Sequence, residues 1–429
     1  MKTILSAWLG CVPALALAAG LPDPILPQGV GVNIHFTRGH EQDLDLIAAA
    51  GFRVIRMDFV WAGIERKKGE YDWFDYDELT RNLERRSLRP YYILDYSNPL
   101  YEETVTAKNP ITGEEQRDTA SPQRPESVAA FARWAAASAQ HFKGRSILWE
   151  IWNEPNISFW KPKPDVRQYT ALALATSKAI RAVDPQAIIV APATSELPWP
   201  FLEELFKAGA LEYLDAVSVH PYRNYRLGPE TAAEDYRRLR ELIERYTPGA
   251  KKKPAILSGE WGYASHRQGV SLQTQAAFIA RQQLANLLND VPVSIWYDWK
   301  NDGADLNERE HNFGTVTHEL QPKPAYVAVQ TLTRELAGYR IEKRLAIGTE
   351  KDFVLWLTDG QGGSKLAAWT TGEPHLIQIA LTGPSDAPLP VVAADGRTTE
   401  VALSQSRIPL ELTAAPQYVR LGTRQVPSP

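Results

Sequence analysis

Short apolar runs alternate with amphipathic segments between residues 30 and 338 of the chain. The apolar runs are typical of parallel β-strands that are covered on both faces, and the segments between them repeat apolar residues at helical spacing. The predicted strands are residues 30–36, 53–59, 90–96, 147–153, 187–192, 216–221, 255–260 and 293–298. The predicted helices are residues 42–50, 75–87, 127–142, 166–183, 201–208, 232–246, 272–289 and 325–336. Eight such strand–helix units predict a (β/α)8 TIM barrel over residues 22–338.

An open, doubly wound α/β sheet is the alternative architecture for this pattern. That fold places a glycine-rich phosphate loop directly after its first strand. Here the first predicted strand runs through Val32-Asn33-Ile34-His35-Phe36, and no glycine-rich loop follows it. The closed barrel is therefore favoured.

A second unit is predicted over residues 339–429. It contains short β-rich runs separated by turn signals such as Asp359-Gly360 and Asp395-Gly396. The runs are residues 353–357, 366–369, 376–381, 391–393, 408–412 and 418–421. This spacing predicts a small C-terminal antiparallel β-sandwich.

Residues 1–19 have the pattern of a secretory signal peptide. Lys2 precedes an apolar run and small residues end it, so cleavage is expected near Ala18 or Ala19. We therefore expect a secreted or periplasmic protein. Lipid attachment at Cys11 is the alternative, although Trp8-Leu9-Gly10 is a poor lipoprotein junction. Cys11 is the only cysteine, so loss of the leader would exclude disulfides and cysteine catalysis.

Composition excludes several classes of function. The formal net charge of −4 argues against a surface that neutralises nucleic-acid phosphates. No run outside the leader approaches the roughly 18 apolar residues of a membrane-spanning helix. The eight histidines lack metal-ligand spacing, so we expect neither a catalytic metal nor another cofactor.

Polar residues gather at the C-terminal ends of the predicted strands, where barrel enzymes place their chemistry. The strand ends carry Asn33, His35, Arg56, Asp58, Asp95, Tyr96, Asn153, Glu154, His220, Tyr222, Glu260 and Asp298. A barrel whose loops serve only structure would not need ionisable groups at nearly every strand end. We therefore predict a substrate-binding mouth, with His35, Asp95 and Tyr96 among its contacts.

Two of these residues, Glu154 and Glu260, follow the fourth and seventh strands and can flank one substrate bond. Paired carboxylates about 5–5.5 Å apart suit retaining glycoside hydrolysis, and a gap of about 6.5–9.5 Å suits inversion. Glu154 fits the proton donor. Glu260, with Arg56 and Tyr222 across the mouth, fits the carboxylate that stays ionised.

Three motifs resemble those of the clan A glycoside hydrolases. They are Trp149-Glu150-Ile151-Trp152-Asn153-Glu154-Pro155, His220-Pro221-Tyr222 and Ser258-Gly259-Glu260-Trp261. The appended β-sandwich makes family 39 the most similar family, with its β-xylosidases, α-L-iduronidases and exopolysaccharide endoglycosidases. Family 5 cellulase-like enzymes also fit.

The resemblance implies a role for each matching residue. Glu154 would be the general acid/base and Glu260 the nucleophile of a double displacement with retention. Asn153 would hydrogen-bond the sugar 2-hydroxyl, and Arg56 and Tyr222 would hold Glu260 ionised. His220 would lie beside the acid/base, and Trp296 would form the floor under the reacting sugar.

The chain has 13 tryptophans, and several fall at strand ends. Indole rings stack on the C–H faces of sugars, so Trp261, Trp296 and Trp299 are expected to contact substrate. Core packing is the alternative reading for about half of the strand-end tryptophans. The acidic segment 301–308 could bind a structural ion or a cationic or amino sugar. The polar insertion 98–124 could wall the cleft or be inert.

Together these features predict a retaining glycoside hydrolase that cleaves β-linked polysaccharide or oligosaccharide, with internal cleavage favoured by the likeness to exopolysaccharide hydrolases. The alternatives are an exo-acting glycosidase, a transglycosylase, and a catalytically silent carbohydrate-binding barrel. The presence of both glutamates disfavours the silent barrel, because a lectin needs neither.

Overall fold

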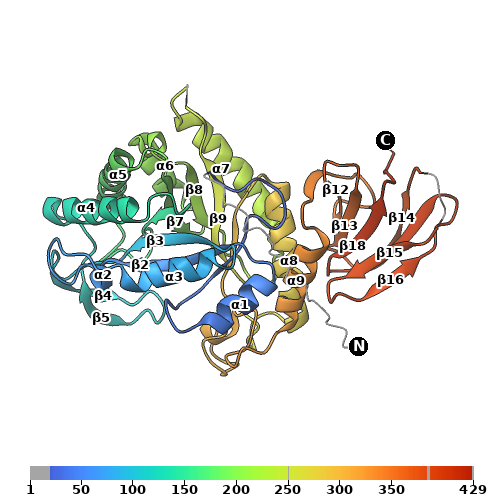
Figure 1. The fold of residues 1–429 in the computed structure, drawn as a ribbon, viewed down its shortest axis with the longest axis horizontal. Helices are drawn as coiled ribbons and strands as arrows, with labels where there is room; N and C mark the ends of the chain where they lie inside the picture. Colours follow the sequence, from blue (N-terminus) through green and yellow to red (C-terminus); the bar gives the residue numbers. More distant parts are fainter. Residues whose placement is uncertain (1–19, 250, 384–386, 428–429) are drawn as a thin grey trace, which may run out of the picture.

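The computed structural model describes residues 20–249, 251–383 and 387–427, so the predicted leader lies outside the described residues. Eight parallel strands close into a barrel (Figure 1). They are β1 (Val30–Asn33), β2 (Val54–Val60), β3 (Arg89–Asp95), β6 (Leu148–Ile151), β7 (Ile188–Ser195), β8 (Ala216–His220), β9 (Ala255–Trp261) and β10 (Ser294–Trp296). Neighbours around the ring follow the order β1-β10-β9-β8-β7-β6-β3-β2. The predicted TIM barrel is confirmed.

Each predicted helix is present and covers the outside of the barrel (Figure 1). The helices are α1 (Glu41–Ala49), α3 (Phe74–Glu84), α4 (Pro125–His141), α5 (Val166–Val183), α6 (Trp199–Lys207), α7 (Ala233–Tyr246), α8 (Leu272–Leu288) and α9 (Pro324–Glu335). Short turns add α2 (Trp61–Ile64) and the 3-10 helices η1 (Ala210–Glu212), η2 (Pro229–Ala232) and η3 (Glu310–Asn312). Local sequence signals set several helix ends: Asp165 caps α5 by accepting from two backbone N–H groups, and Pro324 is the first residue of α9.

The lower barrel interior is apolar and the upper end is polar. A buried cluster that includes Val54, Leu148, Ile188 and Ile295 fills the interior near the N-terminal ends of the strands. Because the strands are parallel, their C-terminal ends meet at one edge, which we call the mouth. Side chains at the mouth are thus brought together from strands far apart in sequence.

The insertion after β3 forms an antiparallel hairpin of β4 (Thr104–Lys108) and β5 (Glu115–Thr119). The sequence predicted no strand here. β5 has no apolar residue, and β4 turns only Val105 and Ala107 toward the protein, so the apolar alternation by which a strand is recognised is too short to detect. An ion pair between Lys161 and Asp118 ties the hairpin to the loop after β6.

The C-terminal unit consists of two antiparallel sheets that enclose a second apolar core. A six-stranded sheet has the order β11 (Arg340–Arg344), β12 (Asp352–Thr358), β13 (Ser364–Thr370), β18 (Gln417–Gly422), β15 (Leu389–Ala393) and β16 (Thr398–Val401). A two-stranded sheet pairs β14 (His375–Ala380) with β17 (Arg407–Leu412). All six predicted β-runs are strands, which confirms the predicted sandwich. The edge strands β11 and β16 were missed because they are short and mostly exposed.

The sandwich packs directly against α8 and α9 (Figure 1). Arg281 of α8 donates two hydrogen bonds of 2.6 Å to the Glu230 carboxylate. The same carboxylate accepts a hydrogen bond of 2.7 Å from the indole N–H of Trp369 in β13. Arg420 of β18 bonds Glu335 at the end of α9. Buried polar bonds of this kind fix the orientation of two packed units.

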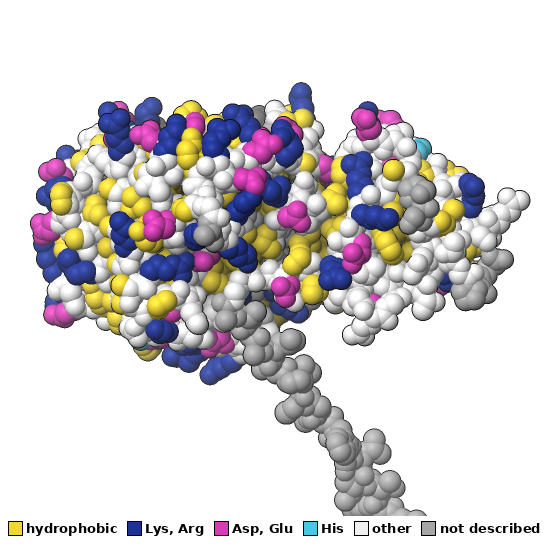
Figure 2. Space-filling view, turned by 90° about the horizontal axis from the view of Figure 1, so that it is seen from above, with side chains coloured by type: hydrophobic (Ala, Val, Ile, Leu, Met, Phe, Trp, Pro, Cys, Tyr) yellow, Lys and Arg dark blue, Asp and Glu magenta, His cyan; other side chains and the backbone are white. Residues whose placement is uncertain are grey.

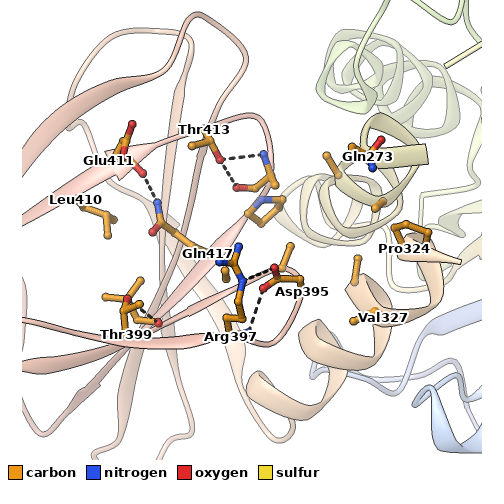
Figure 3. A pocket seen from close by; sticks show the side chains of 18 of the residues that line it. Gln273, Pro324, Val327, Asp395, Arg397, Thr399, Leu410, Glu411, Thr413 and Gln417 are labelled. Carbon is orange, nitrogen blue, oxygen red and sulfur yellow. Dashed lines mark hydrogen bonds and ion pairs between the residues drawn. The ribbon is translucent and has the colours of Figure 1, made fainter. Parts of the chain in front are cut away.

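A cavity of about 1020 Å³ lies where the sandwich meets α8 and α9. Figure 3 shows Gln273, Pro324 and Val327 on the helical side, facing Arg397 in the turn before β16 and Gln417 of β18. None of the predicted site residues lines this cavity, so its size alone does not make it the reaction centre.

The surface has no single dominant charge on the face shown in Figure 2, where cationic and anionic side chains are interspersed over the barrel. In the described part of the chain, every helix is too short or too polar to cross a membrane.

Candidate active site

Glu154 lies in a constrained turn immediately after β6. Trp152 and Glu154 both have positive φ, 70° and 45°, in the left-handed region that non-glycine residues seldom adopt. Backbone hydrogen bonds hold the turn: Trp152 N–H donates to Leu94 at 3.1 Å and Glu154 N–H donates to Ala193 at 2.9 Å. Such strain costs about 1–3 kcal/mol per residue and is retained where it aims a functional side chain. Here it directs the Glu154 carboxylate into the mouth.

Glu260 is the penultimate residue of β9, and the glycine before it leaves room for its neighbours. A Cβ on Gly259 would lie 2.1 Å from Ser218 Oγ and 3.2 Å from a Glu150 oxygen. The glycine in the Ser258-Gly259-Glu260-Trp261 motif is therefore required by close packing under the site.

Glu154 and Glu260 converge across the mouth. A carboxylate oxygen of Glu154, a carboxylate oxygen of Glu260 and a ring nitrogen of His220 all lie within 4.8 Å of one another. Both carboxylates are nearly buried, with exposed side-chain fractions of 9% for Glu154 and 13% for Glu260. This spacing brings the two groups close enough to act on the two sides of one glycosidic bond.

Arg56 of β2 connects the groups around this pair. Its Nη1 donates to Glu260 Oε2 at 2.6 Å and to Asn33 Oδ1 at 3.2 Å. Its Nη2 donates to Asn153 Oδ1 at 2.8 Å, and its Nε donates to Glu150 Oε2 at 2.7 Å. The guanidinium is 1% exposed, so these bonds form in a setting of low dielectric, where charge-assisted hydrogen bonds are strong.

The environment of Glu260 favours its ionised form. Burial by itself raises the pKa of the Glu260 carboxyl, but the positive charge of Arg56 and the hydrogen bond from Tyr222 lower it below the usual value. The Tyr222 hydroxyl donates to Oε1 at 2.8 Å, while Arg56 occupies Oε2. Both oxygens are thus held in place, and the carboxylate is fixed in one orientation.

Glu154 has a different set of partners. His220, at the end of β8, contacts its Oε1 through Nδ1 at 2.9 Å. The other ring nitrogen, Nε2, faces Arg56 Nη2 at 3.3 Å, and because a guanidinium only donates, Nε2 is the acceptor. The ring proton therefore lies on Nδ1 and points at Glu154. Glu154 thus meets a single imidazole, whereas Glu260 meets a guanidinium and a hydroxyl.

Glu154, His220 and Glu260 are close enough together to share a metal ion. Their surroundings do not fit one. The buried Arg56 cation already binds Glu260 and faces His220, so a metal ion would be placed beside a positive charge. The only His220 nitrogen turned toward Glu154 carries the ring proton. The absence of a catalytic metal stays a prediction.

Three of the other predicted substrate contacts, Asn153, Tyr96 and His35, lie at the edge of the mouth. The side-chain oxygen of Asn153 accepts a hydrogen bond from Arg56, and the Asn153 side chain also contacts the half-buried Tyr96. His35 is exposed over 45% of its side chain and lies 3.6 Å from Asp298; burial lowers its pKa, but Asp298, Asp58 and Asp302 raise it to about 9. These three side chains border the mouth, and their contact with substrate stays a prediction.

Asp95 is fully buried and does not open into the mouth. No N–H or O–H donor among the described residues reaches its oxygens, and it faces Asp58 instead. Burial and the nearby charge of Asp58 raise the pKa of Asp95 well above its usual range. Asp95 is therefore suited to be a neutral acid that donates a hydrogen bond to Asp58. It is buried beneath the mouth and does not contact substrate.

The three predicted substrate-stacking tryptophans are packed into the protein. Trp261 and Trp296 are 0% exposed and Trp299 is 1% exposed. Their rings have no open face in this structure, in agreement with the packing alternative. Trp299 does line a small cavity next to the mouth.

Sequence reasoning missed several residues of the site. Glu150 and Tyr91 lie one layer below the catalytic pair, where Tyr91 donates to Glu150 and Glu150 accepts from Arg56. Tyr297 borders the mouth between His35 and Phe313. A charged residue inside a strand that is otherwise apolar was the signal for Glu150, since such a charge needs a buried partner.

A closed (β/α)8 barrel with two glutamates converging from its fourth and seventh strands defines a clan A glycoside hydrolase. The family model for cellulase (glycosyl hydrolase family 5) matches residues 24–303, and the chain belongs to this family. The resemblance to clan A is confirmed. No curated protein matched the sequence.

Solved structures of related enzymes share the fold of both units. A family 39 glycoside hydrolase from the gut symbiont Bacteroides cellulosilyticus WH2 has a TM-score of 0.78 at 24% identity, covering 93% of this chain and 82% of that one. A monomeric β-xylosidase from Caulobacter crescentus CB15 has a TM-score of 0.66 at 18% identity, covering 96% and 98%. A family 30 endoxylanase from Clostridium papyrosolvens C71 has a TM-score of 0.65 at 12% identity, covering 95% and 98%. At these identities the likeness concerns the fold.

Proposed function

We propose that this glycoside hydrolase cleaves β-glycosidic bonds with retention of configuration, in an extracellular polysaccharide or oligosaccharide. The observation that carries the proposal is the approach of Glu154 and Glu260 to within 4.8 Å, with unequal partners. An inverting enzyme needs a wider gap that admits a water between carboxylate and sugar.

In the first step Glu260 attacks the anomeric carbon while Glu154 gives its proton to the departing glycosidic oxygen. The C–O bond to the leaving group breaks as the bond to Glu260 forms, which yields a glycosyl ester. In the second step Glu154, now ionised, removes a proton from water, and this water displaces Glu260 with a second inversion.

The fixed hydrogen bonds on Glu260 support its role as the nucleophile. Arg56 and Tyr222 hold both oxygens before substrate arrives, so little reorganisation is needed at the moment of attack. Asn153 is held by Arg56 through its oxygen, which leaves its amide N–H groups to reach the sugar beside the anomeric carbon. A donor in that position would strengthen in the transition state.

Internal cleavage and export complete the proposal. The sequence likeness to exopolysaccharide endoglycosidases and the leader pattern of residues 1–19 support them. Product sizes from plant and bacterial polysaccharides test the first: early appearance of long products supports internal cleavage, and release of only mono- or disaccharides supports an exo-acting enzyme.

The stereochemical outcome is the decisive experiment for the mechanism. Proton NMR during early hydrolysis of an aryl β-glycoside should show the β-anomer of the released sugar first, with the α-anomer growing only by mutarotation. Initial release of the α-anomer would refute double displacement. Absence of hydrolysis over a panel of aryl glycosides and polysaccharides would favour the silent carbohydrate-binding barrel.

A further inference from the structure

A second, smaller cavity lies beside the mouth, between the loops that follow β1 and β10. Its volume is about 170 Å³. At about 30 Å³ per liquid water, this is room for five to six waters or one sugar ring. Asn33 and His35 line the cavity. The side-chain oxygen of Asn33 accepts a hydrogen bond of 3.2 Å from Arg56 Nη1, the same nitrogen that donates to Glu260. The cavity therefore lies next to the reaction centre, and Asn33 connects the two through Arg56.

One wall of this side cavity is aromatic. The rings of Phe36 and His40 are stacked, with centroids 4.1 Å apart and an interplanar angle of 17°. Trp299 also lines the cavity, but it is only 1% exposed, so the Phe36–His40 pair supplies the aromatic surface. Flat aromatic surfaces of this kind pack against the C–H faces of sugars.

The polar side of the cavity has acceptors without donors. Asp298 is 1% exposed, and its Oδ1 has no hydrogen-bond donor among the described residues, while Oδ2 lies 3.6 Å from His35. Asp302 lies nearby and is exposed, and no hydrogen bond or ion pair within the described part of the chain engages its carboxylate. A buried acceptor without a donor is costly, so a ligand that fills this cavity should bring donors.

The cations around the cavity already have partners. Lys300 Nζ lies 3.6 Å from Asp43, and Lys323 Nζ donates to Asn301 Oδ1 at 3.1 Å. The segment 301–310, which follows β10, contains four carboxylates and one arginine. His35, whose pKa is raised to about 9, is a further cation at the cavity and lies 3.6 Å from Asp298, so among the described residues Asp302 is the lining carboxylate left without an ion pair.

We propose that the side cavity binds a sugar unit with a free amine, linked to the unit that is cleaved. An ammonium group supplies a donor to Asp298 Oδ1 and a positive charge beside Asp302, whereas a hydroxyl brings no charge and an acetamido group removes it. This inference rests on the proposed function, since it names the class of glycan that the same cleft accepts.

A metal ion is a weaker explanation for these carboxylates. Within the described residues, the only three His, Cys, Asp or Glu side chains close enough to share one ion are those of the reaction centre. The side cavity is also larger than one ion needs, and its aromatic wall offers no ligand atoms for a hard cation.

Paired substrates test the inference. Aryl β-disaccharides would share the reacting unit and differ only in the distal unit, which would be glucosamine, glucose or N-acetylglucosamine. The reacting unit is first chosen from aryl monoglycosides whose hydrolysis Glu260→Ala abolishes. We expect kcat/KM to be at least about tenfold higher for the amine than for either neutral analogue, and this preference should shrink as salt is raised.

Two charge-neutralising variants test whether the preference for the amine-bearing disaccharide arises at the side cavity. Asp302→Asn should remove most of it, because this carboxylate lies at the cavity. Glu308→Gln is the matched control: it removes a charge from the same segment but does not line the cavity, so it should keep the preference. Equal cleavage of the three disaccharides, or equal effects of both variants, would overturn the inference.

Binding without turnover separates this inference from the proposed function. Calorimetry with Glu260→Gln should show tighter binding of short chitosan oligosaccharides than of cello- or chitin oligosaccharides of equal length. If aryl monoglycosides are cleaved but no amine preference appears, the side-cavity inference fails and the proposed function stands. If no glycoside is cleaved and chitosan still binds more tightly, the proposed function fails and the cavity assignment survives.

Discussion

Two buried arginines, one at the barrel mouth and one at the junction with the sandwich, show how the same side chain serves different purposes. Arg56 is 1% exposed and Arg281 is 4% exposed. Arg281 places both ends of its fork on a single carboxylate, that of Glu230. Arg56 instead distributes its N–H groups over acceptors from four barrel strands or the turns that follow them, including Glu150, Asn153 and Glu260.

The two arginines differ because the two regions have different requirements. The bidentate Arg281–Glu230 pair is a local contact, so its loss should weaken the packing of the sandwich on the barrel without changing catalysis. A guanidinium shared among several groups fixes their mutual geometry and places a positive charge beside the nucleophile. Its loss should therefore act on catalysis and folding together.

The largest effect is expected for Glu260→Ala. Removal of the nucleophile should lower kcat/KM for aryl glycosides by about 10⁴-fold or more. Azide should restore part of the turnover and give a glycosyl azide of inverted configuration, because a small anion can enter the space left by the side chain. Circular dichroism and thermal melting verify folding. Activity that stays within tenfold of wild type would refute the role of Glu260.

Next comes Glu154→Ala, whose effect should depend on the leaving group. Substrates that need protonation should lose about 10²–10⁴-fold in kcat/KM. Aryl glycosides with acidic phenols should lose much less in the glycosylation step, because their phenolate departs unaided. A plot of rate against the pKa of the phenol therefore steepens in the variant. An equal loss for all leaving groups would contradict the acid role.

Exchanging each arginine for lysine directly tests the comparison. Arg56→Lys keeps a positive charge but loses the fork, so kcat/KM should fall by about 10²-fold and stability should fall as well, since buried carboxylates lose donors. Arg281→Lys should leave kcat/KM within about twofold and lower the free energy of unfolding by about 1–3 kcal/mol. The measurements are steady-state kinetics and denaturant unfolding of both variants. If Arg281→Lys reduced activity as strongly as Arg56→Lys, the distinction between the two sites would be lost.

The barrel strands were predictable because each is a compact apolar run followed by a polar end. The position of Glu154 and Glu260 followed from the rule that barrel chemistry collects at one end of the strands. The hairpin of β4 and β5 and the edge strands β11 and β16 were not predictable from pattern, because each buries at most one or two apolar side chains.

The finer structure of the site depended on contacts between distant strands. The sequence places Glu150 and Arg56 94 residues apart, and only barrel closure makes them partners. The burial of Trp296 and of Asp95 likewise depends on which neighbours cover them, a property that the end of a strand does not reveal. Position along a strand thus predicted which residues come near the mouth, but not which of them open into it.

The smallest effect is expected for Tyr222→Phe, and it concerns pH. The nucleophile must be ionised, so the acidic limb of kcat/KM against pH follows the pKa of Glu260 in the free enzyme. That pKa is lowered by Arg56 and by the Tyr222 hydroxyl, in opposition to burial. The native limb should therefore lie below the ordinary carboxyl value of about 4.3. Without the hydroxyl the pKa rises, and the limb should move to higher pH by up to about one unit. The same change removes a contribution to stability that is present above the unfolded-state pKa and lost as pH falls through the folded one. A limb unmoved or shifted to lower pH would contradict the contribution of the Tyr222 hydroxyl to the ionised state of Glu260.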